Sequence, residues 1–173
     1  RPRRGPHPGY HTGGLLAAPP APAGAEADGV AVAAQVRPGD DYTLIGWVGD
    51  CRAYGWNGVR LKLYSNDHTV GDQLRANGAA LELAEQHDNW LRTSLSHAAV
   101  GTVYMATIPD PLVILTSDGV HDQIGHTQME ALVRDHAHDP QALADALVAA
   151  AEPDDEGYRD DATAVIIRRT TVD

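Results

Sequence analysis

The alternation of apolar and polar residues predicts a series of short strands in the first half of the chain. β-Branched and aromatic residues, interrupted by turn dipeptides, begin at Val30. A Pro-Gly-Asp turn at residues 37–41 separates the first two expected strands, and Asn57-Gly58, a dipeptide suited to a type I′ turn, separates the next two. We therefore expect a hairpin meander with strands over residues 30–36, 42–48, 52–56 and 59–64.

The pattern then changes to a helical period. Residues 70–77 end before Gly78, which suits the C′ position that follows a helix. Residues 79–95 carry Leu81, Leu83, Leu91 and Leu95 around an expected break at His87-Asp88. These signals predict one short helix and one longer, interrupted helix.

The second half of the chain mixes strand and helix signals. Pro109-Asp110-Pro111 separates two apolar runs, which we interpret as a strand pair. The spacing of Thr127 and Glu130 indicates a capping box, and Asp139 before a proline indicates the start of another helix. The expected elements are strands over 102–108, 112–117 and 162–168, a helix from about 127, and a helix over 140–151.

Hairpin strands followed by paired helices favour an α+β layered domain over alternating βαβ units. A chain of 173 residues fits a single domain and can bury a substantial core. Residues 1–28 contain six of the eleven prolines and no apolar periodicity, so we interpret them as a disordered tail. The folded domain is expected over residues 29–173.

The composition of the chain argues against several classes of function. The formal charge is −11, and Lys62 is the one lysine, which argues against nucleic acid as a partner because phosphates are neutralised by clustered basic residues. The sequence contains no run of about 18 apolar residues, so it predicts no membrane span. The single cysteine, Cys51, fits a cytoplasmic setting and is expected to be buried and unreactive. The nine histidines lack metal-ligand spacing, so we interpret them as surface residues.

Two aspartate-containing turns are the candidate chemistry. Asp118 and Gly119 follow the apolar run 112–117, and Asp160 with Asp161 precedes the apolar run 162–168. If these strands are antiparallel neighbours, the carboxylates converge, and hard oxygen ligands suit Mg²⁺ or Mn²⁺. The alternative is that both segments are an ordinary turn and a solvated loop.

Four segments, in this order, resemble motifs of the metal-dependent protein phosphatases of the type 2C family. Residues 46–54 contain Gly-Asp-Cys-Arg where the family has Gly-Asp-Ser-Arg, and residues 65–69 resemble its Thr-x-Asp-His-Ser segment. Residues 115–122 contain Ser-Asp-Gly-x-x-Asp, and residues 160–163 read Asp-Asp-Ala-Thr where the family has Asp-Asn-x-Thr. The resemblance extends over residues 29–169.

The resemblance implies a fold, a reaction and a set of ligands. The fold is an α-β-β-α sandwich of two packed antiparallel sheets flanked by helices, here incomplete at its N-terminus. The reaction is hydrolysis of phosphoserine and phosphothreonine in proteins by water, assisted by two Mn²⁺ or Mg²⁺ ions. Asp118 and Asp160 match ligands of one ion, Asp50 and Asp122 match positions that bind a third ion in some members, and Gly119 matches the turn at the metal site.

The first third of the family pattern has no match in these residues. Its Asp-Gly-x-Gly-Gly turn bridges two metals, and Asp28-Gly29 is the one candidate for it here. We therefore expect one partial metal site and weak or no hydrolysis by this chain alone, whose substrate would be a phosphoprotein in cytoplasmic signalling. The alternative is a non-catalytic pseudophosphatase that binds a regulatory partner.

Overall fold

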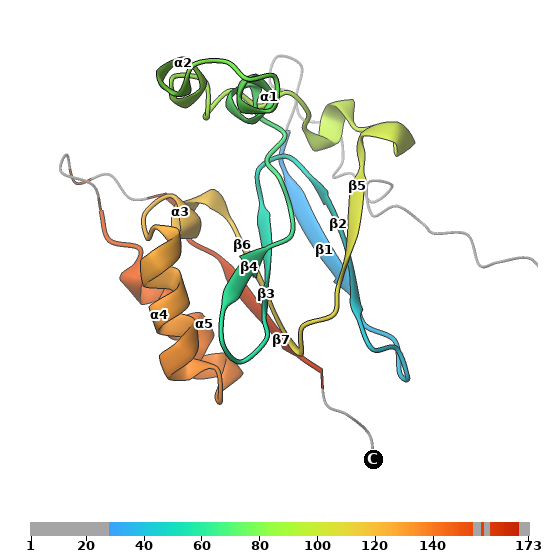
Figure 1. The fold of residues 1–173 in the computed structure, drawn as a ribbon, viewed down its shortest axis with the longest axis vertical. Coiled ribbons are helices and arrows are strands. Elements are labelled where there is room, and N and C mark those ends of the chain that lie inside the picture. The colour runs from blue at the N-terminus through green and yellow to red at the C-terminus, as the bar shows by residue number, and fades with distance from the viewer. Residues whose placement is uncertain (1–27, 154–156, 158–159, 170–173) are drawn as a thin grey trace, which may run out of the picture.

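Two antiparallel sheets packed face to face form the centre of the computed structural model, which describes residues 28–153, 157 and 160–169 (Figure 1). The expected tail over residues 1–28 lies almost entirely outside the described residues. In the described part, the three-stranded sheet has the order β1-β2-β5 and the four-stranded sheet the order β4-β3-β6-β7. The strands are β1 (Ala31–Gln35), β2 (Thr43–Val48), β3 (Arg52–Trp56), β4 (Leu61–Leu63), β5 (Tyr104–Ile108), β6 (Leu112–Thr116) and β7 (Ala164–Arg168).

Helices flank the sheets, so the predicted α+β sandwich is confirmed. Figure 1 shows α4 and α5 against the four-stranded sheet, and α1 and α2 at one end of the sandwich. No described helix is long and apolar enough to cross a membrane. The helices are α1 (Val70–Ala76), α2 (Leu81–Glu85), α3 (Asp118–His121), α4 (His126–His136) and α5 (Pro140–Ala150), with short 3₁₀ turns η2 (Leu95–His97) and η3 (Val100–Thr102).

Strand β6 is the central element of the core, because both of its faces are buried. Leu112 and Ile114 pack toward α4 and α5, against residues such as Met129 and Leu143. Val113 and Leu115, on the opposite face of the strand, pack between the two sheets. A strand that is covered on both faces reads as a continuous apolar run, which is why the sequence identifies it so clearly.

The expected meander is wrong in its connections, because the chain crosses between the sheets three times, after β2, after β4 and after β5. β1 and β2 form a hairpin in one sheet, β3 and β4 form a hairpin in the other, and residues 49–51 join the two. The expected pairing of β5 with β6 is also wrong, since β5 pairs with β2 and β6 with β3. Proline fixes φ near −65°, so Pro109 and Pro111 do not suit a tight hairpin turn. Asp110 instead passes over Gly55, where a Cβ would lie 2.2 Å from its Oδ2 atom.

Three local predictions are corrected. Asn57 does not adopt the positive φ of a type I′ turn, because only glycines have positive φ among the described residues; its side chain instead accepts bonds from the amides of Val59 and Arg60. The helix expected over 79–95 covers only α2. The capping box is absent, since α4 begins after Gly125 and Glu130 accepts a bond from the Leu61 amide.

Other helix signals are confirmed. The Asp139 side chain accepts bonds from the amides of Gln141 and Ala142 at the start of α5. Gly78 has φ +76° directly after the C-cap residue of α1. Both caps follow from local chemistry, which the sequence reports directly.

Candidate metal and phosphate site

The register of β6 and β7 brings the two aspartate turns together. The strands are antiparallel, with Thr116 opposite Ala164. The chain therefore leaves β6 toward Asp118 beside the segment through which it enters β7 from Asp160. The condition set from the sequence, that these strands are antiparallel neighbours, is confirmed.

Ser117 fastens the two turns to each other. Its amide donates to the carbonyl oxygen of Thr163 at 3.0 Å, and its hydroxyl donates to the carbonyl oxygen of Asp161 at 3.1 Å. The same hydroxyl accepts a bond from the Thr163 amide at 3.0 Å. These three bonds continue the ladder beyond the last paired residues of the strands.

Gly119 is required by the closeness of this contact. A Cβ built on Gly119 would lie 2.6 Å from the carbonyl oxygen of Asp161 and 2.9 Å from its carbonyl carbon. Real Cβ contacts essentially never fall below 3.0 Å. The first turn of α3 therefore approaches the loop before β7 only because residue 119 has no side chain.

All four predicted ligands line one cavity of about 700 Å³, together with Gly119. Asp118 and Asp160 come from the two joined turns, and each uses one oxygen to accept the amide that follows it, at 2.8 and 2.7 Å. Asp50 comes from the crossing between β2 and β3, and Asp122 is the C-cap residue of α3. The structure thus brings together residues that are up to 110 positions apart in sequence.

The crossing that carries Asp50 is held from two sides. Gly49 has φ +95°, and a Cβ there would lie 2.1 Å from a methyl carbon of Val30. The Gly49 amide donates to Nδ1 of the buried His68, and the His68 amide donates back to the Gly49 carbonyl oxygen at 2.9 Å. This reciprocal pair fixes the backbone directly before Asp50.

Burial, with repulsion from neighbouring carboxylates, raises the pKa values of Asp50 and Asp122. The pKa of Asp50 lies above its usual value because of burial and the nearby charges of Asp118, Asp67 and Asp122. Burial likewise raises the pKa of Asp122, with the charge of Arg52 opposing the shift. A cavity in which carboxylates resist ionisation is one that a cation stabilises.

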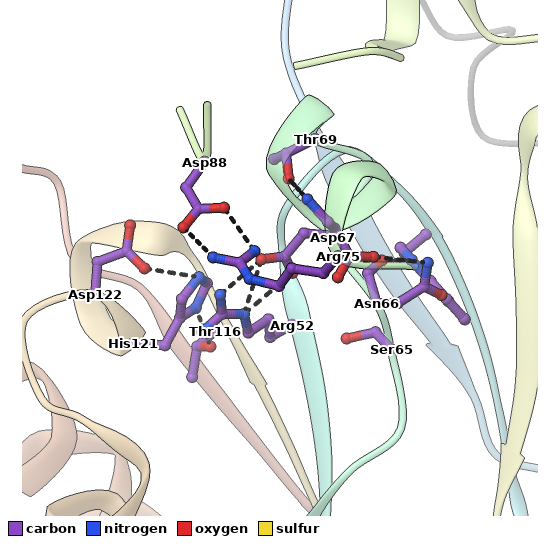
Figure 2. Close-up of polar contacts among 12 residues, drawn as sticks. Arg52, Ser65, Asn66, Asp67, Thr69, Arg75, Asp88, Thr116, His121 and Asp122 are labelled. Carbon is purple, nitrogen blue, oxygen red and sulfur yellow. Dashed lines mark hydrogen bonds and ion pairs between the residues drawn. The ribbon is translucent and has the colours of Figure 1, made fainter. Parts of the chain in front are cut away.

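Arg52 and Asp67 form an ion pair at the cavity wall that the sequence prediction did not include. Arg52 Nη2 donates to Asp67 Oδ2 at 2.6 Å, and its Nε lies 3.1 and 3.2 Å from the two carboxylate oxygens (Figure 2). Burial opposes the charge on Arg52, but the bonds to Asp67 hold its pKa above the usual value. Both residues lie within the segments that resemble the phosphatase motifs, called the family-like segments below. The same motifs that pointed to Asp50 could therefore have pointed to this pair.

His121 corrects the interpretation of the histidines as surface residues. It is buried in α3, and its Nδ1 lies 2.9 Å from the hydroxyl oxygen of Thr116. Burial, with the positive charge of Arg52, lowers the pKa of His121 to about 3. Its Nε2 lies 3.7 Å from an Asp122 oxygen, and because the ring is neutral this contact is no ion pair at neutral pH.

A second ion pair, Arg75–Asp88, stands at the same cavity. Both of its residues line the cavity wall, although neither belongs to the family-like segments. Arg75 Nη1 donates to Asp88 Oδ1 at 2.6 Å, and Nη2 donates to Oδ2 (Figure 2). No motif in the sequence indicates this pair, because its members are 13 residues apart on either side of α2.

Asp28, the candidate for the bridging turn, does not line the cavity. Its Oδ1 accepts bonds from the amides of Gly29 and Ser96, which joins the start of β1 to η2. Hydrogen bonding from the Ser94 side chain, together with these amides, lowers the pKa of Asp28. In this structure Asp28 fastens a loop and supplies no ligand to the acidic cavity.

Cys51 is only half-buried, which is less than predicted. Burial, followed by the negative charges of Asp50 and Asp118, raises its pKa to about 11. The thiol therefore stays protonated at neutral pH, as an unreactive cysteine should.

The donor set fits one hard divalent ion with water completing its coordination. Among the described residues, no group of three or more His, Cys, Asp or Glu side chains is arranged to hold a metal ion. Mg²⁺ nevertheless keeps several waters and often takes only one or two carboxylates from a protein. A site built from Asp118 and Asp160 is therefore compatible with this geometry, whereas a closed protein-only site is not.

The fold is that of the bacterial serine/threonine phosphatases of the metal-dependent type. The serine/threonine phosphatase PstP/Ppp of Mycobacterium tuberculosis matches with a TM-score of 0.63 at 20% identity, over 79% of this chain and 58% of that one. The Ser-Thr phosphatase MsPP of Mycobacterium smegmatis, of the metal-dependent PPM group, matches with a TM-score of 0.55 at 26% identity, over 79% and 59%. No protein-family model and no curated protein matches the sequence.

A third structure carries metal. The catalytic domain of PstP in complex with two manganese ions matches with a TM-score of 0.60 at 17% identity. The match covers 79% of this chain and 56% of that domain. The chain thus spans somewhat more than half the length of the phosphatases that it resembles.

Proposed function

We propose that this chain takes part in the divalent-metal-dependent hydrolysis of phosphoserine and phosphothreonine in proteins. The observation that carries the proposal is the convergence of Asp118 and Asp160 on one acidic cavity, through the β6–β7 register, within a phosphatase fold. Neither residue belongs to the buried core of the described residues.

The residues of the chain have separate tasks in this proposal. Asp118 and Asp160 hold one Mn²⁺ or Mg²⁺ ion, which supplies positive charge for phosphoryl oxygens and lowers the pKa of water. Asp50 and Asp122 line the same cavity, and because burial raises their pKa values, a cation nearby would favour their ionised forms. The Arg52–Asp67 pair fixes the start of β3 beside Asp50.

A second candidate is a non-catalytic binding module of the same fold. The observation that favours it is that the 173 residues contain no Asp-Gly-x-Gly-Gly motif, and that Asp28 lies outside the cavity. A bridging carboxylate is what would hold a second ion in the family pattern. We therefore expect weak hydrolysis from these residues alone. We also propose that the chain meets a phosphoprotein or a regulatory partner, and that it does so in the cytoplasm.

Metal binding to residues 1–173 tests the proposal. The melting temperature of the chelator-treated protein is measured with increasing MnCl₂. Any ion that prefers the folded state stabilises it, by about 1.4 kcal/mol when its concentration is ten times its Kd. For a domain of this size that corresponds to roughly 3–6 °C. Asp118→Asn and Asp160→Asn should each remove most of this rise.

The control is Asp135→Asn, which removes an exposed carboxylate from α4, outside the cavity. It should leave the rise unchanged. Equal rises in all four proteins would contradict the metal site. Hydrolysis of a phosphoserine peptide, measured in the same samples, separates the two candidates: metal-dependent release of phosphate that disappears in Asp118→Asn supports the enzyme, and metal binding without release supports the module.

A further inference from the structure

We propose that Arg75 binds the phosphoryl group of the ligand, and that Asp88 holds its guanidinium in place until a phosphoryl group replaces that carboxylate. The inference rests on the proposed function insofar as it assumes that a phosphate enters the acidic cavity. It adds a substrate-binding residue from α1, outside the family-like segments.

The cavity needs a cation for this ligand. Its carboxylates, which include Asp50, Asp118, Asp122 and Asp160, repel a phosphate dianion. His121 lines the same wall, but its ring is buried and its Nδ1 lies 2.9 Å from the Thr116 hydroxyl oxygen. Among the residues that the structure describes, the arginines that line the cavity are Arg52 and Arg75.

Arg52 is not available for the ligand. Two of its nitrogens contact both oxygens of Asp67, and its side chain is only 26% exposed. Removing one partner from such a half-buried pair leaves the other charge without compensation. Arg75 is more open, with 37% of its side chain exposed and 40% of that of Asp88.

The geometry of the Arg75–Asp88 pair suits an exchange of anions. Two guanidinium nitrogens donate in parallel to the two oxygens of the Asp88 carboxylate. A phosphoryl group offers the same pair of acceptors to this fork. An exposed ion pair contributes only about 0.2–1 kcal/mol, so a ligand of higher charge can displace Asp88.

Asp88 is held in place while Arg75 can turn. Backbone bonds tie the Asp88 loop to α1, with the Val70 amide donating to Trp90 and the Gly71 amide to His87, at 2.8 and 3.0 Å. Gly71 makes this contact possible, since a Cβ there would lie 2.0 Å from Asp88 Oδ1. The long Arg75 side chain has the rotatable bonds to move between the two anions.

Binding of inorganic phosphate, with and without Mg²⁺, tests the proposal by calorimetry on residues 1–173. Arg75→Ala should weaken binding at least about tenfold, since it removes bonds between charged groups. Asp88→Ala should tighten binding roughly two- to fivefold, since it removes the competing carboxylate. The double variant should bind as weakly as Arg75→Ala, and Arg75→Lys should lie between Arg75→Ala and the unchanged protein.

The opposite signs of the two single variants exclude a purely structural role. An ion pair that only fastened α1 to its loop would make both variants less stable and would change binding in the same direction. Arg134→Ala is the matched control, because Arg134 forms an exposed ion pair with Glu130 on α4 at 2.7 Å. It should leave phosphate binding unchanged.

Two results would overturn the inference: unchanged phosphate binding in Arg75→Ala, or weaker binding in Asp88→Ala. Its failure is distinguishable from failure of the proposed function. Phosphate binding that depends on Arg75, in a protein that shows no metal-dependent hydrolysis, supports this inference and favours the binding module over the enzyme. Metal-dependent hydrolysis with phosphate binding indifferent to Arg75 gives the reverse conclusion.

Discussion

Replacing Gly119 with alanine changes one methyl group at the contact between α3 and the loop before β7. The new Cβ would lie 2.6 Å from the Asp161 carbonyl oxygen, and an ordinary contact begins near 3.4 Å. Relieving the contact therefore displaces the Asp161 backbone by about 0.8 Å. The same movement stretches the 3.1 Å bond from the Ser117 hydroxyl beyond hydrogen-bonding distance.

The expected cost follows from these changes. Overpacking costs about 1–3 kcal/mol and a lost hydrogen bond about 1 kcal/mol. Alanine in place of glycine returns about 1 kcal/mol of helix propensity. The net loss of roughly 1–3 kcal/mol lowers the melting temperature by about 2–4 °C for each kcal/mol. Because the movement separates Asp118 from Asp160, the rise in melting temperature with MnCl₂ should shrink as well.

Thermal unfolding by circular dichroism, with and without MnCl₂, measures both effects. Gly101→Ala is the control, since a Cβ on Gly101 meets nothing within 4 Å. It should leave the response to metal unchanged. If Gly119→Ala were as stable as the unchanged protein and responded equally to Mn²⁺, the contact with Asp161 would not be what holds the two carboxylates together.

Two further predictions concern titrating groups. Cys51, with a pKa of about 11, should be thiolate in about one molecule in a thousand at pH 8, so a thiol reagent should label the folded protein far more slowly than the urea-unfolded protein; equal rates would contradict this. Asp50→Asn should raise the metal-free melting temperature at pH 7 by roughly 1–4 °C, because the raised pKa of Asp50 means that its ionised form opposes folding. The stability associated with protonated Asp50 is present below its unfolded pKa and is lost as pH rises through its folded pKa. The difference in melting temperature between the two proteins should therefore vanish near pH 3. A lower melting temperature for Asp50→Asn than for the unchanged protein at pH 7 would refute this.

The sequence predicted the elements better than their partners. β6 could be predicted because both of its faces are buried, and the cap of α5 because Asp139 acts on its own neighbours. The pairing of β5 with β2 could not, because the apolar pattern of a strand does not say which sheet it joins. Leu81 and Leu83 show the same limit, since an expected helix does not say which of its leucines are buried, and both are exposed in α2.

The sequence identified those residues of the candidate site that lie in recognisable motifs. Asp118 and Asp160 were found because each stands beside an apolar strand, and the register then placed them together. His121 was missed because its burial depends on the turn of α3 over β6. Arg75 was missed because its partner is fixed by the packing of α1 against the loop after α2.

The three crossings between the sheets also affect the rate at which the cavity can form. β5 pairs with β2 and β6 with β3 across about sixty residues of chain, and β7 joins β6 across about fifty more. Contacts that close such long loops make folding slow, because the entropy of closure is lost before the contacts are gained. Asp160 reaches Asp118 only when β7 has joined its sheet. A metal ion therefore cannot guide the early steps of folding, and its binding reports that the last of these strands is in place.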